Sequence, residues 1–156
     1  MVTLDKTDRK LLQLVQDDFP LVEKPWAEVA AKLGVGEEEA IRRVKRLLRE
    51  GVISRIGPII DARKVGLKAS TLVAVKVAEG EVERVARIIN GFKEVSHNYE
   101  RDNAYNLWFT VTARDEEELE KVLKKIKRKT GIREDDFLEL RSQRVFKIGL
   151  KFNFTE

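Results

Sequence analysis

The N-terminal part of the chain contains three stretches in which apolar residues recur at helical spacing. The first stretch follows Asp5, a residue type that caps helix N-termini, and the second begins at Pro25 and ends at Gly34. The third covers residues 37–50 and has a single apolar stripe. Three short helices in this order predict a helix-turn-helix unit.

Residues 52–60 have the pattern of two short strands around the turn Gly57-Pro58. A hairpin at this place, directly after the third helix, would be the wing of a winged helix-turn-helix. The sequence therefore predicts a first domain of this type over residues 1–61.

The apolar period changes after a polar connector at residues 62–68. Strand patterns alternate with helical patterns in the order βαββαβ, which predicts a ferredoxin-like domain over residues 62–156 and an α+β chain. The expected strands cover 70–77, 94–101, 105–112 and part of 137–154, and the expected helices cover 81–89 and 116–130. Two helices leave one sheet face uncovered, so we expect a dimer.

Composition limits the chemistry that this chain can perform. It has no cysteine and a single histidine, His97, which excludes disulfides, thiolate nucleophiles, cysteine-bound clusters and histidine-rich metal sites. There is no apolar run of bilayer length and no signal-like N-terminus, so we expect a cytoplasmic protein with no membrane contact. Charged residues make up 37% of the chain, which is typical of thermophile surfaces.

A helix-turn-helix suggests DNA binding, but the residues of the third helix argue against it. This helix begins with Glu37-Glu38-Glu39, where a phosphate backbone would arrive. Residues 1–61 carry 11 Lys and Arg and 11 Asp and Glu, so the net charge of +4 lies in residues 62–156. We expect weak DNA binding. A basic strip on the same helix nevertheless keeps DNA binding as an alternative: Arg42, Arg43, Lys45, Arg46 and Arg49.

The most unusual segment is 95–101, followed closely by 105–110, because it concentrates the histidine, both tyrosines and a tryptophan. Alternate residues of a strand share a face, so His97, Tyr99 and Arg101 should point together. An imidazole, a phenol and a guanidinium on one face suit a flat ligand that bears carboxylates.

The register of this hairpin leaves two alternatives for the neighbouring strand. Either Asn106 and Trp108, or Leu107 and Phe109, join the face of His97. A purely structural interpretation also stays open. A lone histidine on a half-buried strand is often a hydrogen-bonded structural residue, and the aromatic residues can be core or dimer contacts.

Several motifs resemble known families. Residues 4–12 and 51–53 are similar to the Lrp/AsnC superfamily, a resemblance that extends over nearly the whole chain. Four other stretches resemble a narrower group, the siroheme decarboxylases and their relatives in heme d1 synthesis: Arg55-Ile56-Gly57, Ser96-His97-Asn98-Tyr99-Glu100-Arg101, Tyr105-Asn106-Leu107-Trp108-Phe109-Thr110 and Phe146-Lys147-Ile148-Gly149.

The narrower resemblance implies a carboxy-lyase of an alternative heme (porphyrin) biosynthesis pathway. Such enzymes remove the carboxyl groups of the acetate side chains at carbons 12 and 18 of siroheme and leave methyl groups, giving 12,18-didecarboxysiroheme without an added cofactor. The tetrapyrrole is the substrate. The alternative function is that of an Lrp/AsnC-type transcriptional regulator that binds DNA and responds to a small effector.

The resemblance also implies roles for individual residues. His97 resembles the catalytic histidine, either as the acid that protonates the ring or as an axial ligand of the substrate iron, and the protein alone holds no metal. The implied substrate-binding residues are Arg101, Tyr99, Asn98, Asn106, Trp108, Arg144 and Lys147. Two related subunits commonly pair in this group, so we expect a dimer, in particular a heterodimer in which this chain carries the His-Asn-Tyr motif and a paralogous subunit supplies a second histidine.

Overall fold

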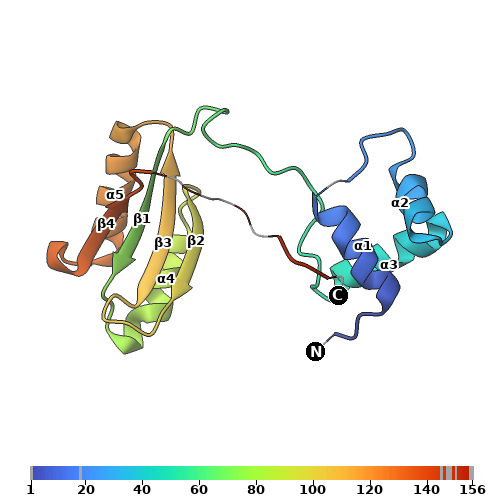
Figure 1. The fold of residues 1–156 in the computed structure, drawn as a ribbon. Coiled ribbons are helices and arrows are strands. Elements are labelled where there is room, and N and C mark those ends of the chain that lie inside the picture. The colour runs from blue at the N-terminus through green and yellow to red at the C-terminus, as the bar shows by residue number, and fades with distance from the viewer. Residues whose placement is uncertain (1, 18, 145, 147–148, 150, 155–156) are drawn as a thin grey trace. The chain divides into compact units, whose positions relative to one another are not determined.

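The computed structural model describes residues 2–17, 19–144, 146, 149 and 151–154. The chain forms two compact units, Met1–Pro58 with Lys147–Glu156, and Ile59–Phe146 (Figure 1). The sequence placed its boundary after residue 61 and assigned everything beyond it to the second domain. The structure instead groups the C-terminal tail with the N-terminal helices.

The first unit contains the three predicted helices, α1 (Lys6–Asp17), α2 (Pro25–Leu33) and α3 (Glu37–Arg49). Their apolar stripes meet in a core of five buried residues: Leu11, Leu12, Val29, Val44 and Leu47. The tail packs on this core through Phe154, and the backbone N–H of Phe152 donates to Gln16 Oε1 at 3.1 Å.

Local signals explain where these helices begin and end. The Asp5 side chain accepts a hydrogen bond from the Asp8 N–H at 2.7 Å, and Asp8 Oδ2 accepts one from the Asp5 N–H at 3.1 Å. This reciprocal arrangement satisfies two N–H groups at the start of α1. Gly34 ends α2 with a φ of 72°, a conformation that glycine adopts without steric cost.

Asp8 also joins α1 to α3 through two arginines. It is 1% exposed, and its carboxylate accepts hydrogen bonds from Arg43 at 2.8 Å and from Arg46 at 2.5 Å. Burial opposes the charged form, but the hydrogen bonds from Arg46 and Arg43 outweigh it and hold the pKa of Asp8 below its ordinary value. The ion pairs therefore fix helix α3 against the first turn of α1.

The predicted wing is wrong. Residues 52–60 are all described and contain no strand, and Ile59 is 94% exposed. A two-stranded hairpin is marginal without a surface to cover its apolar side. In this chain Ile53 packs on the helical core, whereas Ile56, Ile59 and Ile60 are exposed. The chain thus has a helix-turn-helix followed by an extended connector.

The second unit has the predicted βαββαβ order, with short 3₁₀ turns at Glu79–Glu81 and Glu134–Asp136. Its elements are β1 (Ala69–Val75), α4 (Val82–Asn90), β2 (Val95–Glu100), β3 (Leu107–Ala113), α5 (Glu116–Thr130) and β4 (Phe137–Arg141). The strands lie in the order β2-β3-β1-β4 and every neighbouring pair is antiparallel. This confirms a ferredoxin-like sheet and an α+β chain.

Helices α4 and α5 pack on one face of this sheet, which we call the inner face (Figure 1). The core there includes Val73, Phe109, Val111, Leu119 and Ile126, all less than 1% exposed. On the opposite, outer face no described element of this unit covers three half-exposed leucines: Leu72, Leu138 and Leu140.

No helix among the described residues is long and apolar enough to cross a membrane.

Candidate functional site

The register of β2 and β3 settles which residues join His97. His97 lies opposite Thr110 and Tyr99 opposite Trp108, and directly opposed residues of an antiparallel pair share a face. Phe109 is fully buried and belongs to the inner face, so Trp108 and Thr110 are on the outer face. Of the residues in the two alternatives, the structure places Trp108 on the face of His97.

Strand β2 carries a β-bulge directly before His97. Val95 lies opposite Val111, but the next opposed pair is His97 with Thr110, so Ser96 is an extra residue. The Ser96 hydroxyl lies 2.9 Å from His97 Nδ1 and satisfies one of the two ring nitrogens. No hydrogen bond joins the other ring nitrogen, Nε2, to a described residue.

Side-chain contacts bring four of the predicted site residues together. The rings of His97 and Tyr99 stack with centroids 6.1 Å apart. The guanidinium of Arg101 lies 5.6 Å from the centre of the Trp108 ring, and the indole N–H of Trp108 donates to the Tyr105 carbonyl at 2.6 Å. The indole is thus fixed by the segment that precedes β3 and packs against one side of the guanidinium.

These side chains line a shallow pocket of about 320 Å³ on the outer face. The pocket offers an imidazole, a guanidinium, a phenol and aromatic surface. The lining residues are Leu72, His97, Tyr99, Arg101, Trp108, Phe109 and Thr110. Such a wall can bind one side of a flat, anionic molecule and deliver a proton to it. Leu72 and Thr110 were not predicted, because their position depends on the pairing of β3 with both of its neighbours.

The other predicted residues lie elsewhere. Asn98 is opposite buried Phe109 and donates to Asn90 at the end of α4 at 2.8 Å. The Asn106 amide makes two hydrogen bonds with the Val77 backbone, at 2.8 and 2.9 Å, and so joins the start of β3 to the end of β1. Neither asparagine is among the residues of the pocket.

Of the two basic residues predicted near the C-terminus, only Arg144 is described. The Arg144 guanidinium lies 4.9 Å from the ring of Phe146 and is not among the pocket residues. Lys147 lies outside the described residues. Within the part of the chain that is described, no group of three or more His, Asp or Glu side chains could hold a metal ion.

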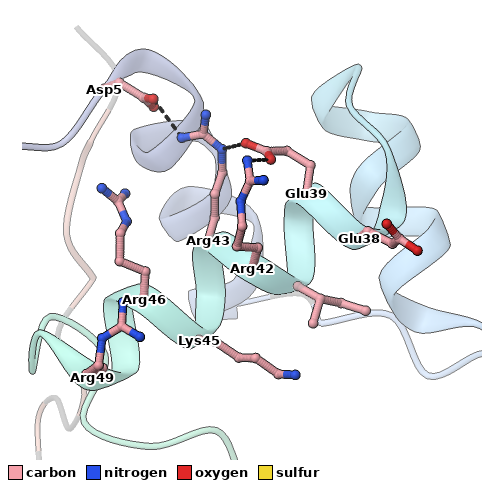
Figure 2. Close-up of a pocket in the computed structure, with 9 residues that line it drawn as sticks. Asp5, Glu38, Glu39, Arg42, Arg43, Lys45, Arg46 and Arg49 are labelled. Atoms are coloured by element: carbon pink, nitrogen blue, oxygen red, sulfur yellow. Dashed lines mark hydrogen bonds and ion pairs between the residues drawn. The ribbon is translucent and has the colours of Figure 1, made fainter.

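A larger groove, of about 700 Å³, runs along helix α3. Figure 2 shows Arg43 between Asp5 and Glu39, with Arg42 paired to the same glutamate. Arg46 is paired with Asp8. Three of the five cations of the basic strip are therefore engaged by carboxylates of the same unit, which leaves less positive charge for a phosphate backbone.

Comparisons with known proteins assign both units. Residues 8–53 match the model of the siroheme decarboxylase NirDL-like HTH domain, and residues 64–147 match that of the AsnC-like ligand binding domain. The chain is 39% identical over 149 residues to the siroheme decarboxylase NirD subunit of Pseudomonas aeruginosa, and the match covers 96% of each chain. The chain belongs to the siroheme decarboxylase family.

Two further relatives place the chain within this family. It is 35% identical over 149 residues to the siroheme decarboxylase NirG subunit of the same bacterium, with 96% of this chain and 99% of that one covered. A crystal structure of the siroheme decarboxylase NirDL, in complex with an iron-uroporphyrin III analogue, matches with a TM-score of 0.67 and 36% identity. That match covers 86% of the present chain but only 44% of the NirDL chain, so the present chain corresponds to less than half of NirDL.

Proposed function

We propose that this chain is a subunit of a siroheme decarboxylase that converts the acetate side chains at carbons 12 and 18 of siroheme into methyl groups. The observation that carries the proposal is the outer-face cluster of His97, Tyr99, Arg101 and Trp108 in a member of this family. A titratable imidazole beside a guanidinium and an aromatic wall suits a flat polycarboxylate that must receive a proton.

The chemistry balances with one proton for each carboxylate. Protonation of the ring carbon next to the one that bears the acetate makes the pyrrole an electron acceptor and leaves the acetate-bearing carbon free to form a double bond to the methylene. The bond between the methylene and the carboxylate then breaks, carbon dioxide leaves, and the electron pair forms an exocyclic double bond. Transfer of a proton to the methylene carbon gives the methyl group, and the ring carbon returns its proton. There is no net oxidation or reduction, so we propose that no further cofactor takes part.

Each outer-face residue has a role in this scheme. Protonated His97 is the acid for the ring carbon, with Ser96 holding its Nδ1 so that Nε2 faces the substrate. Arg101 binds a substrate carboxylate through two parallel hydrogen bonds, and Trp108 keeps the guanidinium in place. Tyr99, which is 55% exposed, packs on the macrocycle. The alternative role of His97, as axial ligand of the substrate iron, uses the same nitrogen.

We further infer that a paralogous subunit completes the site. The pocket forms one wall only, and the outer face around it carries half-exposed Leu72, Leu138 and Leu140. The names of the NirD and NirG subunits, and the NirDL chain more than twice as long as this match, support a pair of related units. A second copy or paralogue on this face would bury the leucines and enclose the substrate.

The regulator alternative has less support. Three of the four arginines of α3 are paired with Asp8, Glu39 and Asp5, and the helix begins with three glutamates. A regulator of this type would also bind its effector through the second unit. The ligand that this unit binds, a small effector or a tetrapyrrole, therefore distinguishes the two functions.

Replacement of Arg101 by alanine should weaken siroheme binding about ten- to hundredfold, because a charge-assisted hydrogen bond is worth about 1.5–3 kcal/mol. The measurement is an anaerobic titration followed in the visible spectrum, with the chain alone and with its paralogous partner. The matched control is Arg128→Ala on α5, which removes the same charge from an exposed site away from the pocket.

No spectral change with the wild-type chain, alone or with its partner, would contradict the proposed function. Unchanged affinity of Arg101→Ala with a lower melting temperature would assign Arg101 to structure instead.

A further inference from the structure

The bulge in β2 determines the direction in which His97 points. Residues two apart in a regular strand share a face, so Val95 and His97 would both face the core. In this chain Val95 packs against the core while His97 is exposed and opposite outer-face Thr110. Only the extra residue at Ser96 allows both positions.

A regular strand would remove the site. If the pairing continued from Val95 with Val111 without a bulge, Ser96 would lie opposite Thr110 and His97 opposite Phe109, which is fully buried. The same shift would turn Tyr99 inward and Asn98 outward, since a slip of one residue exchanges the two faces. Strand β2 is an edge strand, so within the sheet its register is fixed by the pairing with β3 alone.

A second set of contacts fixes β2 from the helix side. The Asn98 side-chain amide donates to Asn90 Oδ1 at 2.8 Å, at the end of α4, and to the Ala86 carbonyl at 3.4 Å, in the middle of this helix. These bonds form only when Asn98 faces inward, which is the register that turns His97 and Tyr99 outward. The Asn98 amide therefore stabilises the bulged register over the regular one.

Stability alone does not explain an asparagine at this position. Its Oδ1 is buried and makes no hydrogen bond within the described part of the chain. A buried polar atom without a partner costs free energy, whereas an apolar side chain of similar size would pack on α4 without this cost. The donor groups of the amide are the feature that a leucine lacks.

We propose that Asn98, held by Asn90, is a positioning residue that keeps the bulged register of β2 and so presents His97 and Tyr99 to the tetrapyrrole. This inference rests on the proposed function for its catalytic consequence. In this role Asn98 contacts α4 and not the substrate, in contrast to the direct substrate contact that the family resemblance implied.

The test compares three variants of the full chain with its partner subunit: Asn98→Leu, Asn90→Leu and Asn90→Asp. Both leucine variants should lower kcat for siroheme decarboxylation about ten- to hundredfold, as expected for a displaced proton donor, while siroheme affinity changes less than kcat. Asn90→Asp keeps the acceptor oxygen and should stay close to wild type. Asn90 is exposed at the end of α4, so its variants carry the test if Asn98→Leu fails to fold.

A second measurement needs no enzyme activity. His97 is the only histidine, so its imidazole gives one unambiguous set of NMR signals in histidine-labelled protein. The leucine variants should shift or broaden these signals, whereas the signals of Asn90→Asp should match those of wild type. If wild type fails to decarboxylate siroheme, the proposed function fails and the NMR result alone decides the positioning role.

Three results would overturn the inference. Wild-type His97 signals and turnover in both leucine variants would show that the amide does not set the register. Weaker siroheme binding in Asn98→Leu with a normal Asn90→Leu would assign Asn98 to substrate contact. A lower melting temperature with normal kcat in the remaining folded protein would leave only a structural role.

Discussion

Replacement of His97 by alanine should lower the rate of siroheme decarboxylation by about 10²–10⁴-fold, because a positioned acid contributes about this much to a proton-transfer step. No other imidazole exists in the chain to replace it. Binding should largely survive, since Arg101, Tyr99 and Trp108 remain in the pocket. The measurement is single-turnover decarboxylation under anaerobic conditions with the partner subunit present.

The same variant distinguishes the other roles of His97. An axial ligand would show itself by an altered visible spectrum of the bound substrate and by weaker binding. Ser96→Ala is the matched control, because it removes the hydroxyl beside His97 Nδ1 but keeps the imidazole, and it should cost much less activity. Near-wild-type turnover by well-folded His97→Ala protein would remove the catalytic assignment.

Replacement of Asp8 by alanine should destabilise the helical unit by about 2–3 kcal/mol. Removal of one partner from a fully buried ion pair costs about 3–5 kcal/mol, but the Arg43 and Arg46 side chains are 21% and 33% exposed and can turn to water. The variant also loses the acceptor for the Asp5 N–H at the start of α1. We therefore expect a loss below that of a fully buried pair.

The stability of the helical unit can be followed separately. Trp26 packs edge-on against Phe19 at 5.0 Å in this unit, and the second of the two tryptophans is Trp108 in the sheet. Urea unfolding followed by Trp26 fluorescence in a Trp108→Phe background reports the Asp8 effect. Glu23→Ala, an exposed position between α1 and α2, is the control with the same change of charge. Equal midpoints for the two variants would contradict the role of Asp8.

The contribution of Asp8 should also depend on pH. Because its pKa is lower in the folded state, the contribution is fully present above the unfolded value of about 3.9 and is lost as the pH falls through the folded value. The difference between wild type and Asp8→Ala should therefore shrink in acid.

The helices were predictable because their ends are decided locally. Helix α5 covers Glu116–Thr130 as expected, with the Asp115 side chain accepting from the Glu118 N–H at its start and Gly131 at a φ of 74° at its end. The wing failed for the opposite reason. A β-like composition at residues 52–60 becomes a hairpin only where another surface covers it, and a local pattern does not contain that information.

The site was predictable only in part. Strand alternation correctly placed His97, Tyr99 and Arg101 together and Asn98 on the other side. The bulge at Ser96 and the choice of Trp108 over Phe109 depend on the pairing of β2 with β3, which the residues of either strand alone do not show. A substrate contact for Asn98 followed from family resemblance, and the structure instead places its amide against α4.

The most direct test of the proposed function is anaerobic incubation of the purified chain with siroheme, with and without its paralogous partner, followed by mass spectrometry of the tetrapyrrole. The function predicts loss of first one and then two carbon dioxide units, with His97→Ala leaving siroheme intact. Siroheme that is bound yet unchanged after incubation of wild type with its partner would contradict a decarboxylase role for this chain.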